Sequence, residues 1–267
     1  MLAAKAAVDC AHIRLLVAED NVINQRVVLK TLQRHGFQTE TVGDGRQALE
    51  ALAAGEYDLV LMDVQMPGMD GLQATRAIRS EEEGTGRHIP IVALTAHAMA
   101  SERDKCLAAG MDAHITKPIR PDELIATILE FTTCAAEAAP DATTGETVER
   151  IEPPQRDGEQ TDIFDRPGAL ERVAGDEELL EELLELFVEE AQTQLDRIEQ
   201  YLVAADAEAA GREAHSLKGS AANLSMEQLR AKAYELEAAG KAGEIDTARR
   251  LLAELRTRYA DVLNRIQ

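Results

Sequence analysis

The sequence predicts an α/β domain with a doubly wound parallel sheet, followed by an all-α domain that forms a four-helix bundle. Short apolar runs alternate with amphipathic helical patterns between residues 13 and 131, as they do in domains built from βα units. From residue 161 onward no strand pattern appears, and apolar residues recur at helical spacing. We therefore expect an N-terminal extension at 1–12, the α/β domain at 13–133, a flexible linker at 134–160 and the helical domain at 161–267.

The first domain should contain five strands and five helices. Segments 13–18, 59–62 and 91–94 are almost entirely apolar, which is typical of parallel strands covered on both faces. Weaker strand patterns occupy 38–42 and 113–116, and helical patterns occupy about 24–35, 45–54, 71–80, 101–109 and 121–131. Gly36, Gly55 and Gly110 follow three of these helices, at positions where a left-handed residue commonly ends a helix.

The rest of the chain is helical apart from the segment that precedes it. Residues 134–160 are rich in Ala, Glu, Thr, Pro and Gly and show no hydrophobic period, which predicts a flexible linker. Asp176 is a candidate N-cap for a long helix. Further helices are expected at about 206–223, 226–239 and 243–266, the second of which follows a capping-box pattern of Ser225 and Gln228. The short connections indicate an up-down bundle.

The composition argues against several classes of partner. A net charge of −21 does not suit nucleic-acid binding, which needs basic surfaces to replace phosphate counterions. The three cysteines, Cys10, Cys106 and Cys134, lack metal-ligand spacing and fit free thiols in a reducing compartment. No apolar run approaches the roughly 20 residues of a membrane span. We therefore expect a cytoplasmic protein with no nucleic-acid partner and no membrane contact within this chain.

Three acidic residues lie at strand ends of the first domain. Glu19 and Asp20 end the first strand, and Asp63 ends the third. In open α/β sheets ligands collect beyond the carboxyl ends of the strands, so these carboxylates are expected to converge. Such charges repel one another unless a cation lies among them, and a set of oxygen ligands with room for water favours Mg²⁺.

The same edge of the sheet adds a hydroxyl and an ammonium group. Thr95 ends the fourth strand and Lys117 the fifth, and both side chains suit phosphate oxygens. Phosphoryl transfer needs little beyond positioning and charge neutralisation, so a central carboxylate, a metal ion and a cation together indicate this chemistry. Asp63 is the predicted phosphoryl acceptor, and Glu19 and Asp20 are predicted metal ligands.

Four segments of the first domain resemble response-regulator receiver domains. They are V-A-E-D-N-V-I-N-Q, L-V-L-M-D-V-Q-M-P-G-M-D-G, V-A-L-T-A and I-T-K-P, and the resemblance spans residues 13–131. The D-N-x-x-N-Q run is similar to that of receivers attached to hybrid histidine kinases. The resemblance implies a flavodoxin-like fold with a five-stranded parallel sheet in the order 2-1-3-4-5.

The resemblance also implies roles for individual residues. Asp63 would be phosphorylated, Thr95 and Lys117 would contact the phosphate, and the peptide bond before Pro118 would be cis. The implied Mg²⁺ ligands are Glu19, Asp20, Asp63 and the backbone carbonyl of Gln65. One position departs from the family, because His114 stands where an aromatic residue is usual, three residues before the lysine.

One histidine of the helical domain has a distinctive setting. His215 lies off the apolar stripe of its helix and is expected to face solvent, with Gly211 and Gly219 one turn away on either side and Arg212 and Lys218 close by. A glycine inside a helix costs about 1 kcal/mol relative to alanine, so two of them beside one ring predict close approach by a partner. An imidazole that is neutral at pH 7 has a nitrogen lone pair that can attack phosphorus.

The sequence H-S-L-K-G resembles the H-x-L-K-G signature of histidine phosphotransfer (Hpt) domains, which are four-helix bundles. The resemblance covers about residues 163–267 and includes the helix that begins G-D-E-E-L-L-E-E-L-L. It implies that His215 accepts a phosphoryl group, that Lys218 helps to orient the phosphate and that Gly219 gives access to the ring.

These features predict a two-component phosphorelay protein. A sensor histidine kinase would phosphorylate Asp63, His215 would take the phosphoryl group, and a downstream response-regulator receiver would accept it. The alternatives are a non-signalling docking module in a two-component assembly and a metal-dependent phosphatase that uses Asp63 as nucleophile. No ATP-binding kinase module is visible, and the sequence fits both a free-standing relay protein and the C-terminal portion of a longer hybrid kinase.

Overall fold

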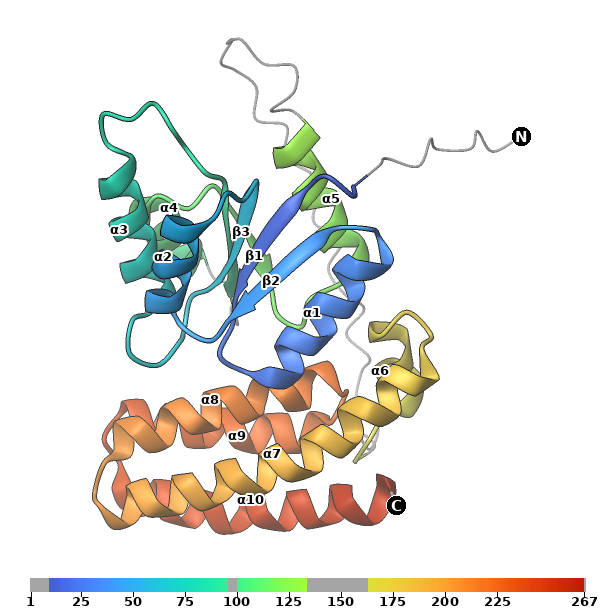
Figure 1. The fold of residues 1–267 in the computed structure, drawn as a ribbon. Helices are drawn as coiled ribbons and strands as arrows, with labels where there is room; N and C mark the ends of the chain where they lie inside the picture. The colour runs from blue at the N-terminus through green and yellow to red at the C-terminus, as the bar shows by residue number, and fades with distance from the viewer. Residues whose placement is uncertain (1–9, 96–99, 134–162, 267) are drawn as a thin grey trace.

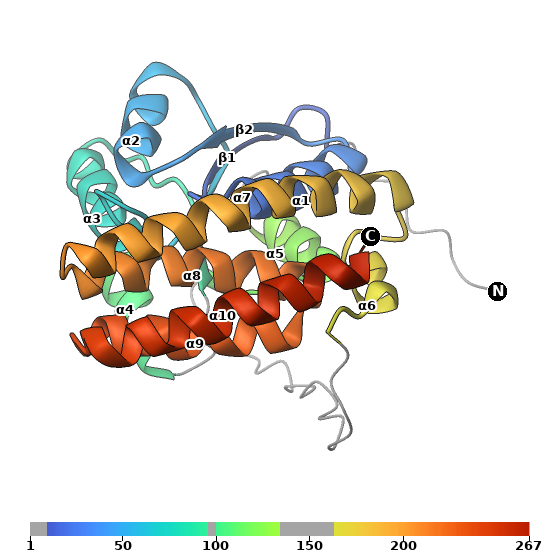
Figure 2. The same cartoon turned by 90° about the horizontal axis from the view of Figure 1, so that it is seen from below.

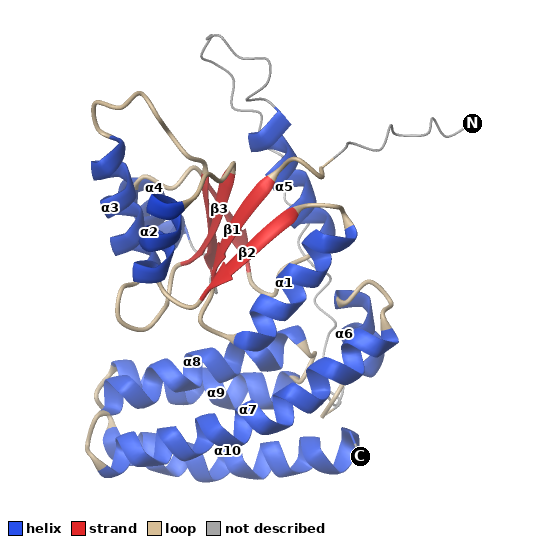
Figure 3. Cartoon of the chain, viewed as in Figure 1, coloured by secondary structure: helices blue, strands red, loops and turns tan. Residues whose placement is uncertain are grey.

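The computed structural model describes residues 10–95, 100–133 and 163–266, so the expected linker lies outside the described residues. The α/β domain has a five-stranded parallel sheet in the order β2-β1-β3-β4-β5 (Figure 3). This order confirms the predicted fold. The strands are β1 (Arg14–Ala18), β2 (Gln38–Val42), β3 (Leu59–Asp63), β4 (Ile91–Thr95) and β5 (Ala113–Thr116).

Helices cover both faces of this sheet (Figure 1). On one face lie α1 (Val22–Arg34) and α5 (Pro121–Thr133), and on the other lie α2 (Gly45–Ala54), α3 (Gly71–Glu82) and α4 (Ala100–Ala109). Successive residues of a strand point to opposite faces, and in β1 Leu15 belongs to the apolar cluster under α1 and α5, while Leu16 belongs to the cluster under the other three helices. Both faces are therefore buried, as the apolar strand patterns predicted.

The expected left-handed glycines are confirmed at two of three helix ends. Gly36 has φ of 85° and Gly110 has φ of 99°. Gly55 is different, because its φ of −144° is extended while its N–H still bonds to the Ala51 carbonyl. The chain leaves α2 by straightening toward β3, so the prediction of a left-handed residue at Gly55 is wrong.

The helical domain is the predicted bundle (Figure 2). Its four long helices are α7 (Glu177–Val203), α8 (Ala207–Asn223), α9 (Glu227–Lys241) and α10 (Ile245–Ile266), and a short α6 (Arg166–Arg172) that the sequence pattern did not predict precedes them. Asp176 caps α7 by accepting a 3.0 Å hydrogen bond from the Leu179 N–H, as expected. The predicted capping box at Ser225 is wrong, since Ser225 has a left-handed φ of 53° and the N-cap of α9 is Met226.

The two domains meet at the carboxyl edge of the sheet. The arrowheads of β1 and β2 point toward the bundle in Figure 1, and α1 lies between the sheet and the bundle, where it contacts α7 and α8. None of the helices in the described ranges has the length and hydropathy needed to cross a membrane.

Candidate functional site

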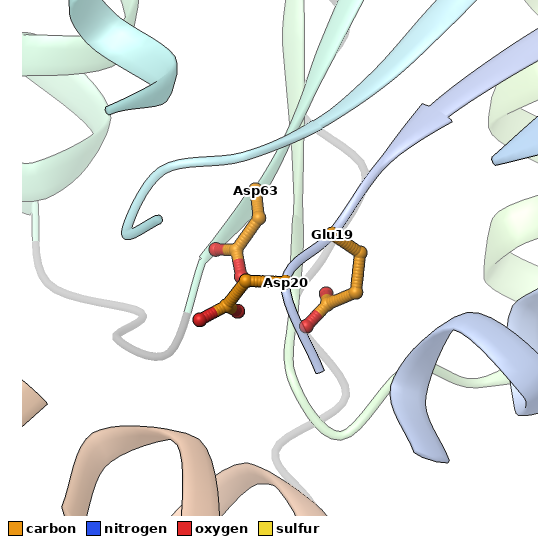
Figure 4. Close-up of side chains that lie close together, drawn as sticks. All are labelled: Glu19, Asp20 and Asp63. Carbon is orange, nitrogen blue, oxygen red and sulfur yellow. The ribbon is translucent and has the colours of Figure 1, made fainter. Parts of the chain in front are cut away.

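The three predicted acids converge at the edge of the sheet that faces the bundle (Figure 4). Each of Glu19, Asp20 and Asp63 offers a carboxylate oxygen, and these atoms all lie within 4.8 Å of one another. The grouping arises because β1 and β3 are neighbours in the sheet and Ala18 pairs with Met62, so the residues that follow each strand meet. Glu19 and Asp63 are buried, which leaves Asp20 nearest to solvent.

Lys117 reaches into the same pocket from the end of β5. Its Nζ lies 2.6 Å from Glu19 Oε2 and 2.6 Å from Asp63 Oδ2. Although burial acts in the opposite direction, the charges of these two carboxylates raise the pKa of Lys117 well above its usual value. The Lys117–Pro118 peptide bond is cis, as the resemblance implied. Lys117 is therefore a fixed cation in contact with the predicted phosphoryl acceptor.

One ammonium group does not balance three carboxylates. Burial and the charge of Asp63 raise the pKa of Asp20 to about 7. Burial also raises the pKa of Asp63 to about 6, where the charge of Glu19 adds to the rise and Lys117 opposes it. A divalent cation would relieve this repulsion, and the donor atoms are all oxygens, the ligands that Mg²⁺ prefers. The residues present therefore fit a magnesium ion.

The repulsion among these carboxylates should be measurable as a pH dependence of the free energy of unfolding. The folded-state pKa of Asp20, about 7, lies above the ordinary aspartate pKa of 3.8, so the folded chain holds the proton more tightly than the unfolded chain. Stability is therefore lost as pH rises from about 4 to 7. Asp20→Asn should remove up to about 4 kcal/mol of this dependence in the presence of EDTA, as measured by urea unfolding between pH 4 and 8.

Added Mg²⁺ provides the control for that experiment. It should raise the free energy of unfolding of the wild-type chain at pH 8 and have a much smaller effect on the Asp20→Asn variant. An identical pH dependence in the two proteins would contradict the proposed repulsion.

The remaining predicted residues of this edge also lie near Asp63. Thr95 is buried at the end of β4, and β4 pairs with β3 so that Leu94 lies beside Asp63. The Gln65 N–H donates a 3.1 Å hydrogen bond to Asp63 Oδ1. Gly71 also belongs to the site, although no sequence pattern singled it out, because an added Cβ would lie 2.1 Å from the Asp63 carbonyl oxygen. Only a glycine allows α3 to begin so close to the predicted acceptor.

His215 lies on α8 within a buried polar cluster that the sequence did not predict. Its Nδ1 is 3.0 Å from Glu237 Oε1 on α9, and Lys218 Nζ is 2.6 Å from Glu237 Oε2 and 3.2 Å from the same Nδ1. Although burial acts the other way, His215 and Lys218 hold the pKa of Glu237 well below its usual range. An ionised carboxylate can only accept hydrogen bonds and an ammonium can only donate them, so Nδ1 bonds one of these two groups at a time. The contact with Glu237 is the shorter of the two and favours the tautomer with the proton on Nδ1 and the lone pair on Nε2.

The histidine is less exposed than the sequence predicted. Its side chain is 12% exposed, and burial lowers the pKa of His215 below its usual value, so the ring is neutral at pH 7. Asn21, which follows Asp20, donates a 2.8 Å hydrogen bond to the hydroxyl of Ser216, which follows His215, so the ring lies close to the acid pocket. The expectation that His215 faces solvent is wrong because the α/β domain covers this side of α8.

The two glycines that flank His215 have different roles. A Cβ at Gly219 would lie 3.1 Å from Asn24 Nδ2 of α1, so Gly219 is where the other domain approaches α8. A Cβ at Gly211 would instead lie 3.2 Å from the Gly240 Cα and 3.3 Å from the Glu237 carbonyl oxygen. Gly211 therefore allows α8 and α9 to pack closely, and the prediction that it clears space for a partner is wrong.

The cations beside His215 also differ. Lys218 is buried next to the ring, whereas Arg212 pairs with Glu208 on the exposed side of α8. Of the two, only Lys218 is positioned to act on a group bound at the ring. Glu237 lies 22 residues after His215 on another helix, and no local sequence pattern connects the two.

Comparisons with known proteins find two domain families in this chain. The response regulator receiver domain family matches residues 15–129 and the Hpt domain family matches residues 182–265. The sensor histidine kinase GacS of Pseudomonas protegens is 34% identical over 255 residues, which cover 91% of this chain and 27% of GacS. Histidine kinase 1 of Arabidopsis thaliana is 42% identical over 153 residues, which cover 45% of this chain and 13% of that kinase. The chain thus spans a small part of the curated relatives that it matches.

Among solved structures, the receiver domain of sensor histidine kinase PA1611 from Pseudomonas aeruginosa PAO1 was determined with a magnesium ion coordinated in its active site cleft. It is 38% identical, with a TM-score of 0.42, and the match covers 45% of this chain and 98% of that domain.

Proposed function

This chain contains a response regulator receiver domain followed by an Hpt domain, as in the phosphorelay portions of hybrid sensor histidine kinases, and from this we propose a relay between two of its residues. Asp63 accepts a phosphoryl group from the phosphohistidine of a sensor histidine kinase. His215 then carries the group to or from a receiver aspartate, including that of a downstream response regulator. We place the receiver at 13–133 and the Hpt domain at 161–267.

The chemistry is a nucleophilic substitution at phosphorus. The Nε2 lone pair of His215 attacks the phosphorus of the acyl phosphate on Asp63. The bond between phosphorus and the Asp63 oxygen breaks, and its electron pair returns to the carboxylate. The ring becomes an N-phosphorylated imidazolium that keeps its Nδ1 proton. Glu237 accepts the hydrogen bond from that proton, and its negative charge stabilises the cation as it forms.

The other residues of the pocket position the phosphoryl group and balance its charge. Lys117 and Thr95 contact its oxygens, and Lys218 is close enough to the ring to orient the group once it has moved to His215. Glu19, Asp20, Asp63 and the carbonyl of Gln65 would hold Mg²⁺, which supplies positive charge to the phosphoryl oxygens when bound. This assignment is supported by the 4.8 Å grouping of the three carboxylates.

One observation carries the proposal. Two groups of complementary phosphotransfer chemistry lie on opposite sides of one boundary between two domains, where Asn21 bonds Ser216 and Ser220. One group is a buried carboxylate beside a lysine, and the other is an imidazole beside a carboxylate. Neither a docking module nor a phosphatase requires an orienting carboxylate on the imidazole.

The chemical lability of bound phosphate tests the order of transfer. Wild-type chain labelled by a cognate kinase should carry both base-labile acyl phosphate and acid-labile phosphohistidine. The His215→Gln variant should retain the base-labile label on Asp63 and lose the acid-labile fraction. The same labelling of His215→Gln at neutral pH without Mg²⁺ serves as the metal control. Acid-labile phosphate that persists in His215→Gln would show that another histidine is the acceptor.

A further inference from the structure

Helix α1 of the receiver domain is packed on two sides. Val28 and Leu32 belong to the apolar cluster that covers the sheet, whereas Ile23 and Val27 belong to the core cluster of the helical bundle. Ile23 is 0% exposed and Val27 is 4% exposed. The same helix therefore contributes to the cores of both domains, and the bundle buries apolar side chains that a separated receiver would expose to water.

The first turn of α1 forms a hydrogen-bonded contact with α8 beside the reactive histidine. Asn21 Nδ2 donates to Ser216 Oγ at 2.8 Å and to Ser220 Oγ at 2.7 Å. Asn24 Oδ1 accepts a 2.7 Å hydrogen bond from Asn223 Nδ2, and Asn24 Nδ2 donates to Glu19 Oε1 at 2.8 Å. Asn24 thus connects the acid pocket directly to α8, and this contact lies over Gly219.

Two arginines of α1 extend the contact along α7. Arg26 Nε donates a 2.7 Å hydrogen bond to Glu182 Oε1. Arg34 pairs with Asp176, the N-cap of α7, and donates a 2.8 Å hydrogen bond to the carbonyl of Val173 at the end of α6. The bundle surface is acidic here and α1 is basic, so the charges of the two surfaces are complementary.

We propose that the Hpt domain of this chain docks on its own receiver through this α1 surface, formed by Asn21, Ile23, Asn24, Arg26, Val27 and Arg34. Resting on the proposed function, this docking makes transfer between Asp63 and His215 a reaction within one chain. The same contact occupies the side of α8 that presents His215. A kinase or a second receiver therefore reaches either phosphorylation site only after the two domains separate.

The Arg26–Glu182 pair allows the proposal to be tested outside the reacting groups. Arg26→Glu and Glu182→Arg each place like charges opposite each other, and the double variant restores an attractive pair in the opposite sense. Each single change should slow transfer from Asp63 to His215 about threefold to tenfold, because a partly exposed pair contributes modestly. The double variant should recover most of the wild-type rate.

Transfer to an outside receiver should change in the opposite direction. With phosphate already on His215, the single variants should pass it to a purified receiver domain faster than wild type does. Their weakened contact lets the Hpt domain separate more often from the receiver of the same chain, which exposes His215. Arg87→Glu is the matched control, since Arg87 pairs with Glu56 on an exposed surface of the receiver away from α1. It should leave both rates unchanged.

The kinetics distinguish docking within the chain from a chance encounter. Wild-type transfer should be first order and independent of protein concentration, whereas a mixture of Asp63→Asn and His215→Gln chains should transfer more slowly and in proportion to concentration. Equal rates in the mixture and in wild type, or single variants that match Arg87→Glu, would overturn the docking proposal while leaving the relay intact. Absence of label on Asp63 and His215 would instead overturn the proposed function.

Discussion

Asp63→Asn is expected to abolish kinase-dependent phosphorylation of both domains. An amide cannot form the acyl phosphate, so uptake by the receiver should fall by on the order of 10³-fold or more, as losses of a nucleophile do. Because the proposed route to His215 passes through Asp63, the acid-labile label should disappear as well. The measurement is incorporation of radiolabelled phosphate from a cognate kinase and ATP, separated by treatment with acid and with base.

The fold should survive this substitution. The pKa of Asp63 is raised to about 6, so its charged form is disfavoured at this buried position and a neutral side chain of the same shape should not lower the free energy of unfolding at pH 8. Urea unfolding of the variant provides the control. Undiminished labelling of His215 in a folded Asp63→Asn chain would mean that the histidine is charged by another donor and that the order of transfer is wrong.

The second large effect is expected at Glu237. Glu237→Ala removes the acceptor for His215 Nδ1 and leaves Lys218, whose side chain is 7% exposed, without its carboxylate. Breaking a buried ion pair from one side typically costs about 3–5 kcal/mol, so this variant should be strongly destabilised. Glu237→Gln is the more informative change, because it keeps the size of the side chain and an acceptor oxygen but removes the charge.

In Glu237→Gln the phosphotransfer rate at His215 should fall by roughly 10- to 100-fold. The forming imidazolium loses its counter-charge, and the ring proton is no longer held on Nδ1. Nitrogen NMR of the ring should show a mixed tautomer population in the variant and a proton on Nδ1 in wild type. Lys241→Gln is the matched control, because Lys241 bonds the same carboxylate from the exposed side without touching the ring. A Glu237→Gln chain with wild-type rate and tautomer would remove Glu237 from the site.

Much of this protein could be predicted from local patterns. The period of apolar residues predicted all five strands and the four long helices, because burial on one or two faces imposes that period wherever the element packs. The residues Glu19, Asp20, Asp63, Thr95 and Lys117 could be predicted to lie together, since the carboxyl ends of parallel strands always share an edge. The cis bond at Pro118 was implied by family resemblance alone.

Other features depend on how separate elements pack, which no local pattern records. Glu237 approaches His215 because α9 crosses α8 at Gly211 and Gly240, where their backbones nearly touch. The burial of His215 and the docking of α1 on α7 and α8 are decided by side chains more than 150 residues apart, such as Arg26 and Glu182. Periodicity states which face of a helix is buried, but the partner that buries it is selected by shape and charge in three dimensions.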